Sequence, residues 1–290
     1  MSRQRGYRAF NEPESIIGRP GDRATGRPAR RAHRPDEPHR PTGPTGPPAR
    51  RARRAHRARP ARRAQRAYFG HAPREAVLNP ETGRPTVAVV EAYAELARRV
   101  LAGPARLGRT RLVAVDGPSG AGKSRFAARL ADALAGPLGG RPPVVHTDDL
   151  LDGWDDQVTF WPRLDEGVLA PLRNGKPGAY RRYSWVRQRF LPRPVAVPVA
   201  PVLVVEGVSA ARAVVRPELT LAVFVTAPAS LRLSRAVARD GPEILPELRR
   251  WHDGERAHFA VDETATHADL LVDGAPTLPH DAERYYVRLR

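Results

Sequence analysis

Residues 117–124 read Gly-Pro-Ser-Gly-Ala-Gly-Lys-Ser, and this stretch decides the fold. It fits the phosphate-loop pattern G-x-x-x-x-G-K-S/T at every fixed position. Apolar β-branched residues cluster at 111–116 just before it, as they do in a short buried strand. Apolar residues then recur at helical spacing from Lys123 to about Leu134. A strand, a glycine-rich loop and a helix in this order predict a nucleotide-binding α/β domain.

The glycines of this loop and the helix after it suit the binding of phosphate groups. Glycine lets the backbone curl so that its N–H groups point at phosphate oxygens, and the helix N-terminus adds a partial positive charge. Lys123 is expected to reach the β- and γ-phosphates of ATP, and the Ser124 hydroxyl to hold Mg²⁺. The predicted ATP site comprises Gly117, Pro118, Ser119, Gly120, Ala121, Gly122, Lys123, Ser124 and Arg125. The alternative is a glycine turn that precedes a helix by chance.

Length and composition limit the class of protein. The chain has 290 residues, a formal net charge of +18 and no cysteine, which excludes disulfides, thiolate metal sites and a cysteine nucleophile. Lys123 and Lys176 are the only lysines, so almost every other basic residue is arginine. No apolar run approaches the roughly 20 residues that a membrane-spanning helix needs, and the N-terminus lacks the apolar segment of a secretion signal. These features predict a cytoplasmic protein with no membrane partner and leave its oligomeric state open.

The positive charge is concentrated in the first part of the chain. Residues 1–75 contain 20 arginines against 6 acidic residues, and the rest of the chain is nearly balanced. This segment is rich in Arg, Pro, Ala and Gly and is predicted to be a disordered basic arm. It is either a tether for nucleic acid, which the function does not require, or a solvated tail, or an over-long reading frame. Residues 76–108 are predicted to form an N-terminal helix and a linker, because apolar residues between 86 and 101 lie three and four apart.

The remaining residues, 109–290, alternate between apolar strands and helical segments. Strands are predicted at 111–116, 143–146, 202–205, 219–225 and 269–272. Helices are predicted at 123–134, 158–172, 229–240 and 246–262. Near-continuous apolar strands of this kind predict a parallel sheet that is covered by helices on both faces.

Acidic residues follow three of the predicted strands, where ligands of such sheets bind. Asp116 ends the first strand, Asp148 and Asp149 follow the second, and Glu206 ends the third. Asp148 is predicted to orient the attacking hydroxyl and accept its proton, and Glu206 to hold Mg²⁺ together with Ser124. The alternatives are a capping aspartate in a turn and an ordinary charge at a strand end.

Two further groups of residues are candidates for the reaction. Arg232, Arg235 and Arg239 share one face of the predicted helix 229–240, and Arg232 and Arg235 are predicted to cover the transferred phosphoryl group, unless the face is merely solvated. Cations and aromatic rings mix in Tyr-Arg-Arg-Tyr-Ser-Trp at 180–185. The predicted acceptor-binding residues are Asp149, Tyr180, Arg182 and Tyr183. An edge strand with an arginine-covered face is the alternative, and Trp154, Trp161 and Trp251 are predicted to serve packing.

With these residues in hand, the region from about Arg109 to Asp273 resembles the uridine kinase-like group of phosphate-loop kinases. The likeness rests on the loop at 117–124, the acidic pair in Val-Val-His-Thr-Asp-Asp-Leu at 144–150, and Val-Val-Glu-Gly-Val at 204–208. More narrowly, the chain looks like the actinobacterial-type, high-GC branch of that group. The resemblance implies an α/β fold with a five-stranded parallel sheet and a small helical lid. It also implies that Asp148 is the base, and that Lys123 and Ser124 serve ATP and Mg²⁺.

The resemblance does not extend to the acceptor pocket. Well-studied uridine kinases follow their aspartate with Ser-Phe-Tyr, whereas this chain has Asp149-Leu150-Leu151. The sequence therefore predicts an ATP-dependent phosphotransferase whose acceptor is a hydroxyl group of a nucleoside-like small molecule. A cytidylate-type nucleotide kinase or a sugar kinase is the alternative within the class. A non-catalytic ATP-binding protein with a nucleic-acid-binding arm is the alternative from another class.

Overall fold

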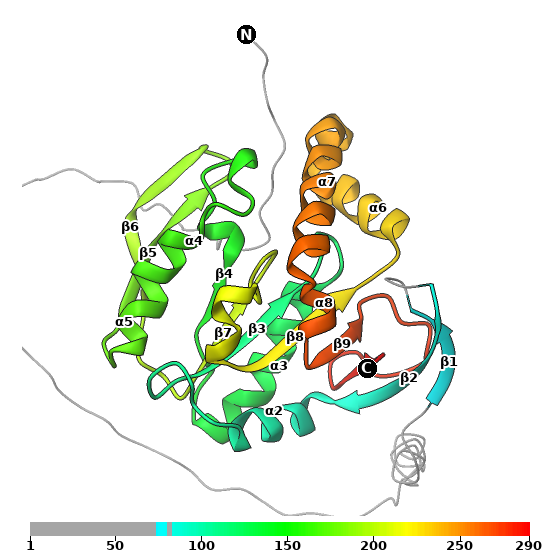
Figure 1. Cartoon of the computed structure of the whole chain (residues 1–290), viewed down its shortest axis with the longest axis horizontal. Helices are drawn as coiled ribbons and strands as arrows, with labels where there is room; N and C mark the ends of the chain where they lie inside the picture. The colour runs from blue at the N-terminus through cyan, green and yellow to red at the C-terminus, as the bar shows by residue number, and fades with distance from the viewer. Residues whose placement is uncertain (1–73, 80–82) are drawn as a thin grey trace, which may run out of the picture. The chain divides into compact units, whose positions relative to one another are not determined.

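The computed structural model describes residues 74–79 and 83–290 and is organised around one eight-stranded sheet (Figure 1). The strand order is β1-β2-β10-β9-β8-β3-β7-β4. The strands are β1 (Arg74–Leu78), β2 (Pro85–Ala92), β3 (Arg111–Asp116), β4 (Val144–His146), β7 (Val202–Glu206), β8 (Leu219–Thr226), β9 (Leu270–Asp273) and β10 (Tyr285–Arg288). The predicted basic arm lies almost wholly outside the described residues, so its disorder and its link to nucleic acid stay predictions.

The five strands β9, β8, β3, β7 and β4 pair in parallel, which confirms the predicted five-stranded parallel sheet. Their apolar side chains are buried because helices cover both faces of this part of the sheet. Along β3, Val113 and Val115 pack into one core, whereas Leu112 and Ala114 pack into the other. This alternation follows from the two-residue period of a strand. Because the five strands are parallel, their carboxyl ends lie at one rim of the sheet, and the phosphate loop begins at that rim.

The remaining strands extend the sheet beyond β9 and correct one prediction. Residues 86–101 were expected to form one helix ahead of the core, but 85–92 form β2, and only 93–102 form a helix, α2. β2 pairs antiparallel with β10, near the other end of the described chain. The Tyr286 hydroxyl donates a hydrogen bond to Glu91 across this pair, at 2.7 Å. The β-branched run at 86–90 prefers a strand once β10 supplies a partner, and no local pattern reveals that partner.

The helices of the described chain form two layers and one arm. They are α2 (Tyr93–Ala102), α3 (Lys123–Leu138), α4 (Trp161–Leu164), α5 (Ala170–Arg173), α6 (Ala229–Asp240), α7 (Leu245–Asp262) and α8 (Thr264–His267). α2 and α3 pack on one face of the sheet through Leu96, Phe126 and Leu130. None of the helices in the described part of the chain has the length and apolarity that a bilayer crossing needs.

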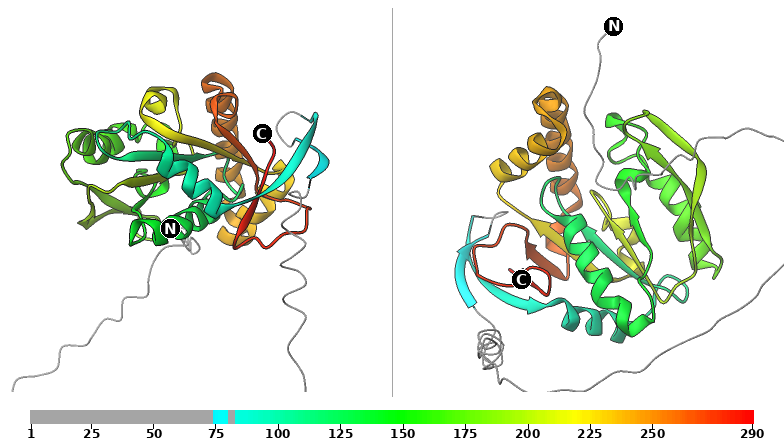
Figure 2. Two further views of the ribbon diagram at one scale, coloured as in Figure 1. Left: turned by 90° about the horizontal axis from the view of Figure 1, so that it is seen from below. Right: turned by 180° about the vertical axis from the view of Figure 1, so that it is seen from behind.

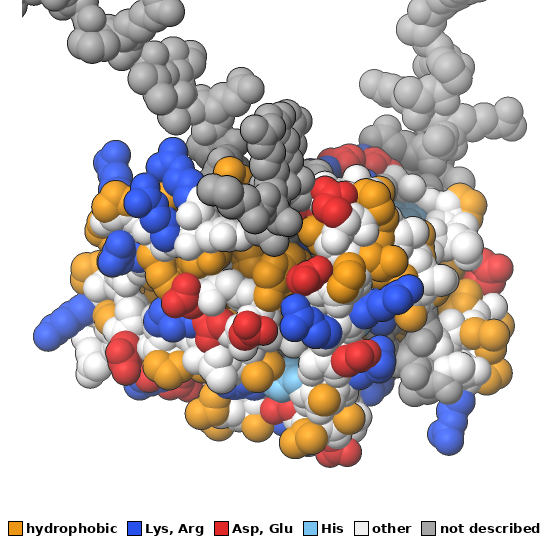
Figure 3. All heavy atoms as spheres, turned by 90° about the horizontal axis from the view of Figure 1, so that it is seen from above, with side chains coloured by type: hydrophobic (Ala, Val, Ile, Leu, Met, Phe, Trp, Pro, Cys, Tyr) orange, Lys and Arg blue, Asp and Glu red, His pale blue; other side chains and the backbone are white. Residues whose placement is uncertain are grey.

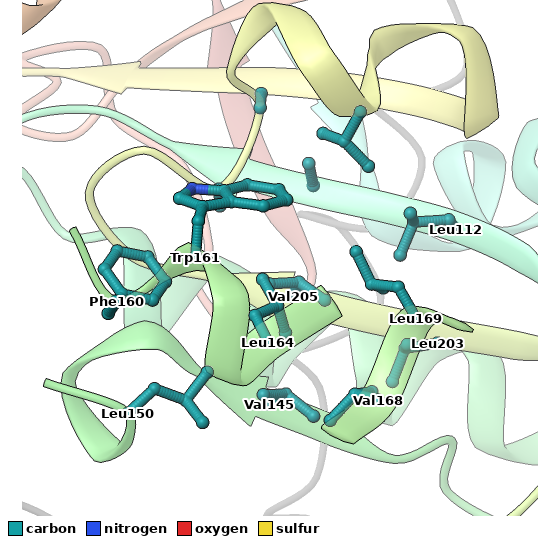
Figure 4. Packing of buried hydrophobic residues seen from close by; sticks show 14 of the residues in the cluster. Leu112, Val145, Leu150, Phe160, Trp161, Leu164, Val168, Leu169, Leu203 and Val205 are labelled. Atoms are coloured by element: carbon teal, nitrogen blue, oxygen red, sulfur yellow. The ribbon is translucent and has the colours of Figure 1, made fainter. Parts of the chain in front are cut away.

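The segment 161–173 covers the opposite face of the sheet (Figure 4). Leu164 and Leu169 of this segment face Val205 and Leu203 of β7 in the core. The predicted helix at 158–172 begins at Trp161 instead and contains a π-helical stretch at 165–169 between α4 and α5. Between β7 and β8 the chain forms a short 3₁₀ helix, at 213–218.

A β-hairpin and the α6–α7 pair lie on opposite sides of the rim of the sheet (Figures 1 and 2). The hairpin consists of β5 (Gly178–Ser184) and β6 (Arg189–Val197). The sequence predicted a strand here only as the alternative for 180–185 and did not predict β6. Helices α6 and α7 occupy almost the residues that the sequence predicted. We refer to α6 and α7 together as the α6–α7 arm. The hairpin and this arm flank the polar residues at the strand ends.

Candidate nucleotide and acceptor site

The phosphate loop has the backbone geometry that its glycines predict. Gly117, Gly120 and Gly122 have φ values of 132°, 76° and 104°, which side-chain-bearing residues rarely adopt. A Cβ atom on Gly117 would lie 2.1 Å from the carbonyl oxygen of Val225, so this position also needs the absence of a side chain. Helix α3 starts immediately afterwards, at Lys123. The N–H groups of Gly117, Ser119 and Ala121 are bonded within the protein, so the backbone around Gly120 and Gly122 and the N-terminus of α3 form the site for an anion.

Lys123 is the cation around which the acidic residues gather. Its ammonium group is largely buried and donates a hydrogen bond to the carbonyl oxygen of Pro118, at 3.1 Å. Burial raises the pKa values of Asp116 and Asp148, and the positive charge of Lys123 opposes the rise in both and favours the ionised form of Glu206. These three acids follow β3, β4 and β7 respectively. The structure thus brings the acids of three strand ends to one lysine, as the sequence predicted.

Asp116 has a structural task at this rim. Its buried carboxylate accepts hydrogen bonds from the backbone N–H groups of Gly117, Ser209 and Ala211, at 2.7 to 2.9 Å. Burial raises the pKa of Asp116 to about 6, against the lowering effect of these hydrogen bonds and of Lys123. Its oxygens are occupied by backbone donors from two loops. Asp116 therefore ties the phosphate loop to the loop after β7.

Glu206 and Ser124, the two residues predicted to hold Mg²⁺, lie in contact with each other. Burial alone would raise the pKa of Glu206, but the hydrogen bond and charge of His146, the charge of Lys123 and the hydrogen bond from the Ser124 hydroxyl together bring it below its usual value. Glu206 is therefore ionised and touches the hydroxyl group of the loop serine. Hard oxygen donors of this kind suit Mg²⁺. In the part of the chain that the structure describes, no cluster of three or more His, Cys, Asp or Glu residues forms a metal site. Phosphate oxygens and water would therefore have to complete the shell of the ion.

Asp148 and Asp149 follow β4 in a single 3₁₀ turn. The side chain of Asp148 is reachable by solvent, although protein crowds it on most sides. This partial desolvation raises the pKa of Asp148, and the Glu206 charge raises it further. The Trp185 indole N–H fixes the main chain here by donating to the carbonyl oxygen of Asp148, at 3.1 Å. Asp148 is thus an accessible carboxyl group beside the phosphate-loop lysine.

Asp149 faces the hairpin rather than the phosphate loop. The Tyr180 hydroxyl donates a hydrogen bond to Asp149, at 3.3 Å. Burial raises the pKa of Asp149 to about 6, while the charges of His146 and Arg182 oppose the rise. Three of the four predicted acceptor-binding residues therefore come together. The fourth, Tyr183, is not part of this cluster. Its ring packs against other rings of the hairpin, those of Trp185 and Phe190, each 5.3 Å away.

The hairpin gives the acceptor side a positive surface. Residues 178–197 contain five arginines and no acidic residue. Seen from above, Lys and Arg side chains gather at the left, the side on which the hairpin lies, and acidic side chains lie nearer the middle of this face (Figure 3). The predicted alternative of an edge strand with an arginine-covered face is thus correct for part of the segment. Its inner residues, Tyr180 and Arg182, still reach the acidic pair.

The arginines of α6 do not act as one row. Arg232 donates from Nε to the carbonyl oxygen of Ala227, at 3.0 Å. Arg235 donates to the carbonyl oxygens of Gly120 and Gly274, at 3.0 and 3.2 Å. Arg239 is the member whose positive charge lowers the pKa of Asp148, and the predicted catalytic set omitted it. Helical spacing alone gave no reason to choose among the three.

The structure also places Arg125, which was predicted for the ATP site, and the tryptophans that were predicted to serve packing. The Arg125 guanidinium lies 3.7 Å from Glu283, on the side of α3 that faces the C-terminal segment. Trp154 packs edge-on against Trp185 of the hairpin at 5.3 Å and against Trp251 of α7 at 5.5 Å. This agrees with the packing role predicted for Trp154 and Trp251, and it links the hairpin to the α6–α7 arm.

Three solved structures show what this arrangement is similar to. A possible uridine kinase from Bacillus stearothermophilus is 18% identical, with a TM-score of 0.47 and coverage of 62% of this chain and 96% of that one. A candidate fructose transport system kinase from Silicibacter sp. TM1040 is 22% identical, with a TM-score of 0.41 and coverage of 62% and 98%. A D-glycerate 3-kinase from Cryptococcus neoformans var. grubii is 17% identical, with a TM-score of 0.33 and coverage of 62% and 71%.

No protein-family model matches the chain, and no curated protein matches it. The first of the three structures bears the description that the sequence resemblance predicted. The narrower actinobacterial branch stays a prediction. At these identities and TM-scores, similarity assigns neither an activity nor an acceptor to the chain.

Proposed function

We propose that the chain is an ATP-dependent phosphotransferase that transfers the γ-phosphoryl group to a hydroxyl group of a nucleoside-like small molecule. One observation carries this proposal. The parallel pairing of β3, β7 and β4 brings Glu206 and the turn that carries Asp148 to the rim where the phosphate loop begins, and the charge of Lys123 acts on both carboxyl groups. Phosphoryl transfer needs this combination of a cation for the phosphates, oxygens for a metal and a carboxylate for the attacking hydroxyl.

The residues of the loop fit ATP and Mg²⁺. Backbone N–H groups beside left-handed glycines suit phosphate oxygens, and Lys123 adds a point charge. Ser124 and the ionised Glu206 would hold Mg²⁺, which neutralises phosphate charge when it is bound. Glu206 takes this role because its carboxylate already contacts the loop serine.

Asp148 supplies the acid–base part of the reaction. A hydroxyl oxygen of the acceptor forms a bond to the γ-phosphorus, the bond from that phosphorus to the β–γ bridging oxygen breaks, and ADP leaves. The hydroxyl proton passes to the carboxylate of Asp148. Its raised pKa brings the group closer to the working pH, which suits a base. Arg239, whose charge reaches Asp148, is the arginine that we place beside the reacting groups.

The acceptor is proposed to bind between Asp149 and the hairpin. Asp149, Tyr180 and Arg182 present a carboxylate, a phenol and a guanidinium within one cluster. Such groups match a ligand with several hydroxyl groups and further hydrogen-bonding atoms. Half-buried indole rings at Trp154 and Trp185 border this cluster and offer contact area to a planar ring. This combination supports a nucleoside-like acceptor over a simple sugar.

A screen of ATP consumption tests the proposal. ADP release is measured with nucleosides, sugars and vitamins as acceptors, for the wild-type chain and for Asp148→Asn. We expect at least one nucleoside to be phosphorylated, and Asp148→Asn to lose about 10²- to 10⁴-fold in kcat with little change in the Kd of ATP. Asp155→Asn, an exposed aspartate of the next turn, is the matched control and should behave as wild type. Equal turnover in wild type and Asp148→Asn would remove Asp148 from this role.

A further inference from the structure

Helix α7 reaches the phosphate loop through a buried glutamate. The Glu255 carboxylate accepts a hydrogen bond from the backbone N–H of Ser119 at 2.7 Å, through Oε1. The same oxygen accepts the indole N–H of Trp251 at 3.0 Å, and that N–H also lies 2.9 Å from the Ser119 hydroxyl. One turn of α7 therefore contacts both the main chain and the side chain of a phosphate-loop residue. Neither contact follows from the phosphate-loop pattern, because the partners lie more than 130 residues apart.

The second oxygen of Glu255 is left without a hydrogen bond. Glu255 is only 1% exposed, and its Oε2 has no hydrogen-bond partner among the described residues. The nearest cation is the Arg232 guanidinium of α6, at 3.8 Å, beyond hydrogen-bond distance. A buried carboxylate with one oxygen that lacks a hydrogen bond lowers the stability of the fold. We therefore expect Glu255 to have a function that offsets this cost.

Arg232 is itself in contact with the loop. A Cβ atom on Gly120 would lie 2.6 Å from the carbonyl oxygen of Arg232, so α6 packs directly on the loop backbone. The Arg232 side chain is mostly buried, with Nε bonded to Ala227 and one terminal nitrogen near Glu255. The tip of the loop at 119–120 therefore lies between α6 and α7. Glu255 of α7 contacts both the loop, at Ser119, and α6, at Arg232.

We propose that Glu255 is a positioning residue that fixes the tip of the phosphate loop and orients Arg232 toward it. This inference rests on the proposed function. Oε1 holds the Ser119 N–H, and thereby the shape of the loop that receives the nucleotide. The unbonded Oε2 holds Arg232 by charge alone, which leaves the guanidinium N–H groups able to turn to a phosphoryl oxygen. Glu255 touches no reacting atom and acts only through Ser119 and Arg232.

Two substitutions at Glu255 separate these tasks. Glutamine keeps an oxygen that accepts the Ser119 N–H but removes the charge, so Glu255→Gln should keep the Kd of ATP within about threefold and lower kcat about tenfold. Glu255→Ala removes the acceptor as well and should raise the Kd of ATP about tenfold, the usual effect of losing a hydrogen bond to a charged group. Calorimetric titration with ATP gives the Kd, and ADP release with the acceptor found in the screen gives kcat.

Glu247→Gln is the control, because this glutamate lies on the same helix and forms an ion pair with the surface residue Arg250, at 3.6 Å. It should change neither constant. Thermal unfolding of every variant guards against a loss of folding, and Glu255→Gln keeps the test valid if Glu255→Ala unfolds. An unchanged kcat for Glu255→Gln would overturn the orienting role. Tighter ATP binding by that variant would overturn the positioning role too, because it would mean that the carboxylate opposes the nucleotide.

A double-mutant cycle decides whether Glu255 acts through Arg232. If it does, Glu255→Gln should lower kcat no further in an Arg232→Gln background. Additive losses would contradict the orienting role. Wild-type turnover together with unchanged constants in the Glu255 variants would overturn this inference alone. A wild-type chain that does not bind ATP would overturn the proposed function and the inference that rests on it.

Discussion

The phosphate loop and the acceptor side of the rim are built in different ways. Eight consecutive residues form the loop, and their contribution is mainly backbone: three left-handed glycines and the start of α3. The acceptor side is made of side chains from separate segments, since Asp149 meets Tyr180 from 31 positions further along the chain. A site built from backbone can be recognised from a short sequence motif, whereas a site built from side chains of separate segments depends on how the hairpin packs against the sheet. Predictions about the loop should therefore show the larger effects.

The largest effect is expected at the lysine of the loop. Lys123→Ala removes the cation that we propose to contact the phosphates and whose charge acts on three acids. Phosphoryl transfer should therefore fall about a thousandfold, as when a preorganised charge is removed from a transition state. ATP binding should weaken as well. Lys176→Ala removes the only other lysine, which is exposed beyond α5, and should leave both constants at their wild-type values. Initial rates and calorimetric titration of the two variants provide the measurement.

Weak binding with normal transfer at saturating ATP would contradict this prediction. Lys123 would then hold only the ground state, because an interaction present equally in the bound substrate and the transition state changes KM without changing kcat. The expected difference in kcat between variants of the phosphate loop and variants of the acceptor side would then be smaller. Loss of activity in Lys176→Ala would likewise show that position and charge near the hairpin matter more than the loop geometry implies.

The parallel part of the sheet could be predicted because local patterns determine it. Strand β3 coincides with the predicted 111–116, and the bounds of α6 coincide with 229–240. Buried parallel strands read as apolar runs in any context, so their existence needs no knowledge of partners. The acids that follow them converge because parallel strands end at one rim. The positions of Asp148, Glu206 and Lys123 thus followed from the sequence.

Long-range partners account for what the sequence could not predict. β2 is a strand because it pairs with β1 on one edge and with the distant β10 on the other. The hairpin β5–β6 forms over a segment without clear periodicity. The same reason explains the arginines of α6. Their spacing places three cations on one helix, but only the packing of α6 on the loop decides which of them faces Asp148. Glu255 was missed because its contact with Ser119 joins two distant segments.

An effect of intermediate size on kcat is expected from the arginines of α6. Arg239→Gln removes a positive charge that acts on Asp148, so kcat should fall about tenfold to a hundredfold. The pKa of Asp148 should rise further, because a stabilising positive charge is lost, and the acid limb of the kcat/KM profile should move to higher pH. The Arg239 guanidinium also pairs with the buried Asp240, at 2.5 and 2.7 Å, so thermal unfolding of this variant is measured as well. Arg235→Gln is the control from the same helix face, because its guanidinium is engaged with the carbonyl oxygens of Gly120 and Gly274. A pH profile that moves equally in both variants would show a general charge effect rather than a local one.

The smallest effect is expected on the acceptor side and depends on pH. Asp149 has a pKa of about 6, so its carboxyl group is neutral below that pH and charged above it. A charged carboxylate accepts hydrogen bonds from acceptor hydroxyls better than a neutral one, so KM for the acceptor should fall severalfold as pH rises through about 6. Asp149→Asn should abolish this dependence. Tyr180→Phe removes a hydrogen bond that lowers the pKa of Asp149, and should keep the dependence with its midpoint moved to higher pH. A KM that changes with pH equally in wild type and Asp149→Asn would place the acceptor away from Asp149. The acceptor side of the rim would then have to be sought elsewhere on the hairpin.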